Sequence, residues 1–75
     1  MPLITPPIAF PRWEKPDGTP LACTEKIKVL NENLAEIQQI LQDALEDGIL
    51  MGACENQLRD VFHETVKTLM NPQQL

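Results

Sequence analysis

The stretch CTEKIKVLNENLAEIQQILQDALEDGILM, residues 23–51, decides the fold because its apolar residues recur at alternating intervals of four and three. Such spacing is typical of a helix that buries one side against another helix. These positions, which we call the apolar seam, are Cys23, Ile27, Leu30, Leu34, Ile37, Leu41, Ala44, Gly48 and Met51. Further apolar residues beside the seam suit a helical bundle better than a two-stranded coiled coil. They are Val29, Ile40, Leu45 and Ile49.

Capping and turn residues set the expected ends of this helix. Thr19-Pro20 suits a helix start, with a hydroxyl at the N-cap and proline at the first helical position, and Thr24 is a second possible cap. Gly48 costs about 1 kcal/mol relative to alanine inside a helix, and we expect the helix to continue through it. Gly52 is the expected C-cap glycine. The sequence therefore predicts one long helix over about residues 20–51.

A second, shorter helix is predicted over about residues 54–70, where Asn71-Pro72 stops it and leaves residues 72–75 frayed. Two helices joined by a short turn lie antiparallel, so facing residues have numbers that add to a constant, here about 103. This register creates four apolar pairs: Leu45–Leu58, Leu41–Phe62, Ile37–Val66 and Leu34–Leu69. It also sets opposite charges near each other: Asp43 near Arg59 and Glu36 near Lys67. The predicted fold is an all-α, antiparallel two-helix hairpin.

The N-terminal segment is predicted to be an extended arm. Residues 1–18 hold five of the seven prolines and show no helical or strand period. Pro16-Asp17-Gly18 is predicted to form a turn that sends the chain back along the long helix. Since an extended chain advances about 3.3 Å per residue and a helix about 1.5 Å, Trp13 should reach the level of Ile27 to Leu30.

Phe10 and Trp13 therefore have two possible roles. Phe10 should reach the level of Leu34, and both aromatic residues would then cover the end of the long helix that the shorter helix leaves exposed. In the alternative, the arm is free and the two aromatic residues anchor it in a groove of another protein.

Charge and composition exclude several classes of partner. The net charge is −5, and no Lys or Arg lies between Lys28 and Arg59 while acidic residues accumulate there. This balance disfavours nucleic acid and anionic membranes. The longest apolar runs are about a third of the roughly 20 residues that span a bilayer. The sequence has only two cysteines and does not open with the pattern of a secretory signal peptide. We therefore expect a cytoplasmic protein with both thiols reduced.

No stretch carries a catalytic motif. The chain has no serine or tyrosine and only three glycines, so it has neither a serine nucleophile nor a phosphate-binding loop, and we expect no enzyme activity and no cofactor. Both cysteines are expected to be buried as small hydrophobic residues. Cys54 is the more reactive candidate because it lies at a predicted helix N-terminus. The alternative function is a thiol-based redox or metal site at Cys54, with Cys23 or His63 assisting.

The leading hypothesis is a small non-enzymatic interaction protein, an accessory subunit or adaptor. We infer no small-molecule substrate for it. The architecture resembles the repressor-of-primer type of hairpin dimer, which implies a homodimeric four-helix bundle. That family's basic RNA-binding face has no counterpart in this acidic sequence, so neither residues nor RNA binding carry over. The candidate partner-binding residues combine exposed apolar positions with the acidic side of the long helix. They are Phe10, Trp13, Ile40, Ile49, Leu50, Glu32, Glu36 and Asp43.

Overall fold

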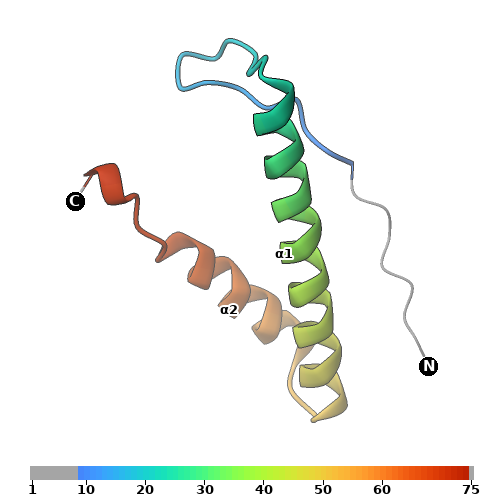
Figure 1. Cartoon of the computed structure of the whole chain (residues 1–75). Helices are drawn as coiled ribbons and strands as arrows, with labels where there is room; N and C mark the ends of the chain where they lie inside the picture. Colours follow the sequence, from blue (N-terminus) through green and yellow to red (C-terminus); the bar gives the residue numbers. More distant parts are fainter. Residues whose placement is uncertain (1–8, 75) are drawn as a thin grey trace. The chain divides into compact units, whose positions relative to one another are not determined.

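The computed structural model describes residues 9–74 and shows an all-α chain. It contains the long helix α1 (Thr24–Leu50), the shorter helix α2 (Glu55–Lys67) and a short 3-10 helix η1 (Pro72–Gln74), as Figure 1 shows. Across residues 9–74 there is no β-strand beyond one isolated bridge between Glu14 and Pro20. The prediction of an all-α fold built from two helices is confirmed.

The chain divides into two compact units whose boundary lies inside α1. The first unit is Met1–Ile40 and the second is Leu41–Leu75. Within the described residues, the first unit therefore contains a loop and the N-terminal part of α1. The second unit contains the C-terminal part of α1, the turn, α2 and η1.

The loop before α1 is a tight hairpin made of residues 13–21, which we call the N-terminal loop (Figure 1). The Gly18 N–H donates to the Lys15 carbonyl at 2.9 Å, and the Lys15 N–H donates to the Thr19 carbonyl at 2.8 Å. Gly18 has a φ of 87°, which favours glycine because it has no Cβ. This is the pattern of a three-residue hairpin loop that ends in a left-handed glycine. The predicted turn at Pro16-Asp17-Gly18 is confirmed.

Asp17 stabilises this loop through its side chain. Its Oδ1 accepts hydrogen bonds from the Thr19 hydroxyl at 2.6 Å and from the Thr19 backbone N–H at 3.0 Å. Because both bonds favour the charged carboxylate, they hold the pKa of Asp17 below its ordinary value of 3.8, the hydroxyl contributing most.

The predicted start of the long helix is wrong by four residues. The expected start lay at Thr19-Pro20, but α1 begins at Thr24. Thr19 and Leu21 are used instead in the N-terminal loop, where the Leu21 N–H donates to the Trp13 carbonyl at 2.9 Å. The first carbonyl to accept a helical hydrogen bond is that of Cys23, from the Ile27 N–H. Residues 19–23 therefore precede the helix, and the first three of them belong to the N-terminal loop.

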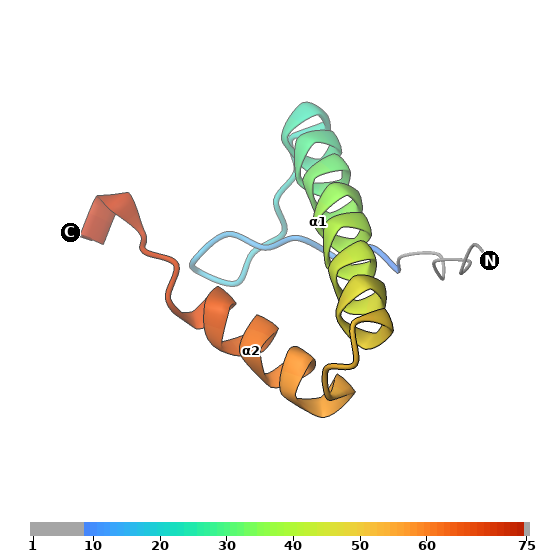
Figure 2. The same ribbon diagram turned by 90° about the horizontal axis from the view of Figure 1, so that it is seen from below.

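The C-terminal end of α1 agrees with the prediction. The helix continues through Gly48 and ends at Leu50, within one residue of the predicted end. The Gly52 N–H donates to the Ile49 carbonyl and the Ala53 N–H donates to the Gly48 carbonyl, which is the Schellman pattern. Gly52 has a φ of 93°, so it is the C-cap glycine that the sequence predicted. Figure 2 shows the short turn that follows into α2.

Helix α2 ends three residues before the predicted position. It begins at Glu55 with Cys54 as N-cap, and it ends at Lys67 with Thr68 as C-cap. The Thr68 hydroxyl donates to the Thr65 carbonyl at 2.8 Å, and the Thr68 N–H is shared between two carbonyls. The Leu69 N–H donates to the Val66 carbonyl, three residues back, so the α-helical bonding pattern ends there. Where the sequence predicted a frayed tail, residues 72–74 form η1, and Leu75 lies outside the described residues.

Side chains in residues 9–74 are at most half-buried. No apolar or polar residue in this part of the chain is buried in a core. Eleven large apolar side chains are exposed there, and five of them belong to α1: Val29, Ile37, Ile40, Ile49 and Leu50. The amphipathic helices thus form without a closed hydrophobic interior around them.

Candidate interaction surface

The N-terminal loop is attached to α1 through Trp13. The indole Nε1–H donates to Asn31 Oδ1 at 2.7 Å, and the Trp13 side chain is half-buried. This contact lies one residue beyond the level of Ile27 to Leu30 at which the sequence placed Trp13. Residues 1–8 of the predicted arm lie outside the described residues, so the packing of the whole arm stays a prediction.

Phe10 lies over the same side of α1 as Trp13. It is 49% exposed and lines an open groove of about 510 Å³. The groove's other lining residues all belong to α1 and are Thr24, Ile27, Lys28, Asn31, Glu32 and Ala35. Phe10 therefore borders α1 while keeping about half of its ring available to a partner.

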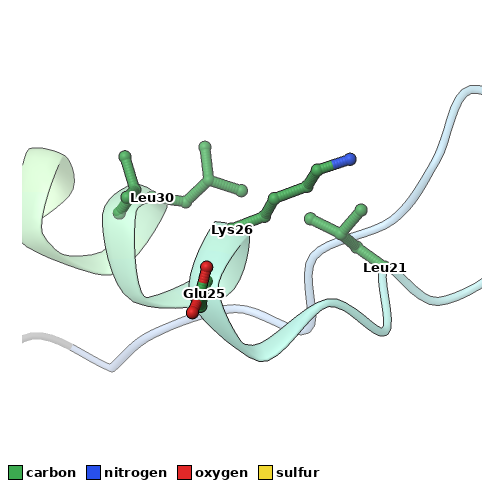
Figure 3. A pocket seen from close by; sticks show the side chains of 5 residues that line it. Leu21, Glu25, Lys26 and Leu30 are labelled. Atoms are coloured by element: carbon green, nitrogen blue, oxygen red, sulfur yellow. The ribbon is translucent and has the colours of Figure 1, made fainter.

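A second open groove lies at the start of α1. It has a volume of about 460 Å³ and is lined by Leu21, Glu25, Lys26, Val29 and Leu30. Figure 3 shows Leu21 of the N-terminal loop near the aliphatic stem of Lys26. Its walls are mostly apolar, and Val29 remains 53% exposed.

In the second unit, α2 contacts α1 at Gly48. A Cβ on Gly48 would lie 2.7 Å from Leu58 Cδ1, so only glycine gives the Leu58 side chain this space without a shift. Leu58 and Phe62 are the two half-buried residues of α2, and the predicted register pairs them with Leu45 and Leu41, which are also half-buried. The pairs that this register extends to Ile37 and Leu34 stay predictions.

The sequence-predicted apolar candidates are exposed. Ile40 is 67% exposed, Ile49 45% and Leu50 85%. In the second unit, further large apolar side chains are exposed on α2 and in the two connecting segments. They are Met51, Val61, Val66, Leu69 and Met70.

The charged side chains pair along their own helices. Lys28 Nζ lies 3.9 Å from Glu32 Oε1, Arg59 Nε lies 3.0 Å from Glu55 Oε2, and Lys67 Nζ lies 3.3 Å from Glu64 Oε1. Each pair joins residues three or four apart on an exposed helix face, where such pairs contribute about 0.3–0.5 kcal/mol. The acidic candidates Glu32, Glu36 and Asp43 are exposed on α1.

The expectation that both thiols are buried is wrong. Cys23 and Cys54 are free and exposed. They occupy the positions just before α1 and α2, at the helix ends rather than on an apolar face. His63 is exposed on α2. Among residues 9–74 no group of three or more His, Cys, Asp or Glu side chains is arranged to hold a metal ion.

Asn31 and Gly48 have structural roles that the sequence pattern did not identify. Asn31 accepts the indole hydrogen bond, although nothing in the apolar spacing distinguishes it from the other polar residues of α1. Gly48 makes room for Leu58, whereas the sequence predicted for it a seam position and a cost in helix propensity. A glycine in a seam position signals close approach of another element, and this signal was available in the sequence.

No helix within the described part of the chain is both long enough and apolar enough to cross a membrane. No protein-family model, curated protein or solved structure matches this chain.

Proposed function

We propose that this chain is a small non-enzymatic protein-interaction module, an accessory subunit or adaptor, that acts through the apolar seam of its long helix. Self-association of two copies into a four-helix bundle in the cytoplasm is the simplest form of this function. No small-molecule substrate, cofactor, nucleic acid or membrane takes part in it. A protein surface is the partner, either a second copy or a larger assembly.

One observation carries this proposal: no side chain among residues 9–74 is buried, while eleven large apolar side chains are exposed. Exposed apolar surface forgoes roughly 25 cal/mol per Å² that burial would return. Below about 70–80 residues, one hydrophobic core rarely stabilises a chain by itself, and disulfides or association with another chain supplement it. Both cysteines are free, so a disulfide does not supply it.

Sedimentation equilibrium on the purified chain tests this proposal. We expect a particle of about twice the 8.5 kDa chain mass, or a monomer that binds a hydrophobic dye strongly. Ile37→Glu places a charge in the seam and should shift the equilibrium toward monomer. The matched control, Gln39→Glu, adds the same charge to an exposed position of α1 and should leave the mass unchanged. A strict monomer that binds no dye contradicts the proposal.

The acidic side of α1 is proposed to orient the partner. Glu32, Glu36 and Asp43 are exposed on α1, which has no Lys or Arg after Lys28. Opposite charges across an interface raise the association rate more than they raise affinity. Reversing all three residues to lysine should slow association with a basic partner surface, measured by stopped-flow. An association rate that is unchanged at low salt argues against this role.

The second candidate function is thiol chemistry at Cys54, favoured by the exposure of both thiols. Because one copy offers no three-ligand group within residues 9–74, a metal ion would need ligands from two copies. Cys23 of a second copy, or His63, would assist Cys54. Thiol titration between pH 5 and 9, together with zinc and copper analysis, tests this candidate. Two slowly reacting thiols in metal-free protein would leave it without support.

A further inference from the structure

The turn between α1 and α2 exposes two adjacent large apolar side chains. Leu50 and Met51 are each 85% exposed, more than any other large apolar residue in the described part of the chain. Met51, the last position of the apolar seam, lies beyond the end of α1 and therefore outside the helical part of the seam. Residues 48–54, which we call the apolar turn, contain no charged residue.

Backbone hydrogen bonds fix the shape of the apolar turn. The Met51 N–H donates to the Asp47 carbonyl at 3.0 Å, and the Gly52 and Ala53 N–H groups donate to the carbonyls of Ile49 and Gly48. Leu58 packs over Gly48 on the other side. The backbone that carries Leu50 and Met51 is thus ordered before binding, so docking would cost side-chain entropy but little backbone entropy.

Acidic residues border the apolar turn on both sides. Glu46 and Asp47 precede it, and Glu55 follows it. The Arg59 guanidinium already lies 3.0 Å from Glu55, so it offsets that charge and leaves Glu46 and Asp47 to set the local sign. A surface that receives the turn must therefore be apolar at its centre and basic at its edge.

We propose that the apolar turn is a docking site for another protein, whose surface offers an apolar pocket bordered by lysine or arginine. Leu50 and Met51 enter the pocket, and Glu46 and Asp47 face its basic edge. This site goes beyond the seam-based function proposed above, because it uses residues at and past the end of α1 rather than the helical face.

The charge pattern favours this partner over two others. Two copies that met turn to turn would bring Glu46 and Asp47 of both chains together, and like charges at an interface are unfavourable. An anionic membrane would repel the same two carboxylates. A basic-edged protein pocket satisfies both the apolar pair and the acidic border.

The probe for this site is a fluorescent synthetic helical hairpin whose two helices form a leucine-lined groove bordered by lysines. Binding is measured by anisotropy for the full chain and for two double variants. Leu50→Ser with Met51→Ser removes the apolar pair. Leu69→Ser with Met70→Ser is the matched control, because it changes the same residue types at positions that are 74% and 71% exposed. Circular dichroism checks that both variants keep their helices.

We expect the Leu50/Met51 variant to bind the probe at least about ten-fold more weakly, since burying one such side chain is worth that much. The Leu69/Met70 variant should stay within about two-fold of the parent, and Asp47→Asn should reduce the salt dependence of binding. Absence of probe binding by the parent, or equal loss in both double variants, overturns the proposal.

Two further outcomes also overturn it and separate it from the seam-based function. If the Leu50/Met51 variant changes the sedimentation mass, the turn serves self-association instead. If the parent binds neutral phosphatidylcholine or anionic phosphatidylglycerol vesicles through Leu50 and Met51, the receiving surface is lipid. If the Leu50/Met51 variant keeps the parent's sedimentation mass and the parent binds no vesicles, the docking site is supported. This result is independent of whether Ile37→Glu shows that the seam dimerises.

Discussion

At the scale of single residues, side-chain hydrogen bonds rather than buried contacts set the N-terminal part of the chain. Trp13 and Asn31 are joined by an indole–amide hydrogen bond, and Asp17 and Thr19 close the N-terminal loop. The proline and glycine of the turn predicted the reversal, since each residue type has a fixed backbone preference. The partner of Trp13 could not be predicted, because any side-chain amide on that side of α1 could accept a hydrogen bond from the indole N–H.

Replacing Asn31 should loosen the attachment of the N-terminal loop. Asn31→Ala removes the acceptor of the indole N–H, and a net hydrogen bond of this kind is worth about 0.5–1.5 kcal/mol. Because Trp13 is the only tryptophan and the chain has no tyrosine, its emission reports this change directly and should move to longer wavelength. Asn33→Ala, on the same helix, is the control and should leave the emission unchanged. Identical spectra for both variants would contradict this role of Asn31.

The ionisation of Asp17 should depend on Thr19. The pKa of Asp17 lies below 3.8 because the Thr19 hydroxyl and N–H bind its charged form. Thr19→Val removes the hydroxyl, the larger cause, and should raise this pKa toward 3.8, measured by NMR titration of the carboxyl carbon. Thr24→Val is the control.

The same depressed pKa gives the N-terminal loop a pH dependence. A carboxyl whose pKa is lower in the folded state stabilises that state above its unfolded pKa, and this contribution is lost as pH falls through the folded pKa. The Asp17–Thr19 bonds should therefore be intact at pH 5 and above and weaken below pH 3.8. The amide shift of Thr19 between pH 5 and 2 measures this loss. A flat Thr19 shift over that range would rule it out.

At the scale of elements, helix ends were predictable where backbone geometry decides them. Gly52 ends α1 as predicted, because only a residue that tolerates positive φ completes the Schellman turn. The start of α1 was not predictable, because Thr19-Pro20 fits both a helix cap and the second strand of a hairpin loop. In the structure, backbone hydrogen bonds to Trp13 and Lys15 hold this segment in the N-terminal loop. Helix α2 also ends earlier than Asn71-Pro72 alone would require, since the Leu69 N–H already bonds to the Val66 carbonyl, three residues back.

Gly48 and Leu58 should be energetically coupled. Gly48→Ala gains about 1 kcal/mol of helix propensity but places a Cβ 2.7 Å from Leu58 Cδ1. The Leu58 side chain must then rotate, which offsets the gain. In a double-mutant cycle with Leu58→Ala, measured by urea unfolding, we expect a coupling of at least about 0.5 kcal/mol. Strict additivity of the two changes would show that the contact has no energetic weight.

At the scale of the whole chain, the sequence predicted the helical class and the surplus of apolar positions. It predicted that Ile40, Ile49 and Leu50 stay exposed. It could not predict which residues of the seam itself remain exposed, because the seam spacing is the same for a face that closes within one chain and a face that awaits a second. Ile37 belongs to the seam and yet is 51% exposed. Several seam and turn residues could therefore form the candidate site, and only the structure shows how exposed each of them is.

Stability of the chain should depend on its concentration. If two copies bury the seam together, only the folded state binds a second copy, so mass action raises the thermal midpoint as protein concentration rises. Differential scanning calorimetry from about 10 µM to 1 mM should show an upward shift of several degrees for the parent. Ile37→Glu should remove this shift and Gln39→Glu should keep it. A parent midpoint that is independent of concentration would contradict self-association.

The lack of a buried side chain within residues 9–74 has a consequence for turnover in the cell. Copies without a companion would present Leu50, Met51 and their neighbours to chaperones and proteases, which act on chains that expose apolar segments. Synthesis alone would then not set abundance. The amount of this chain should instead follow the amount of the protein that shelters it, and surplus copies should be short-lived.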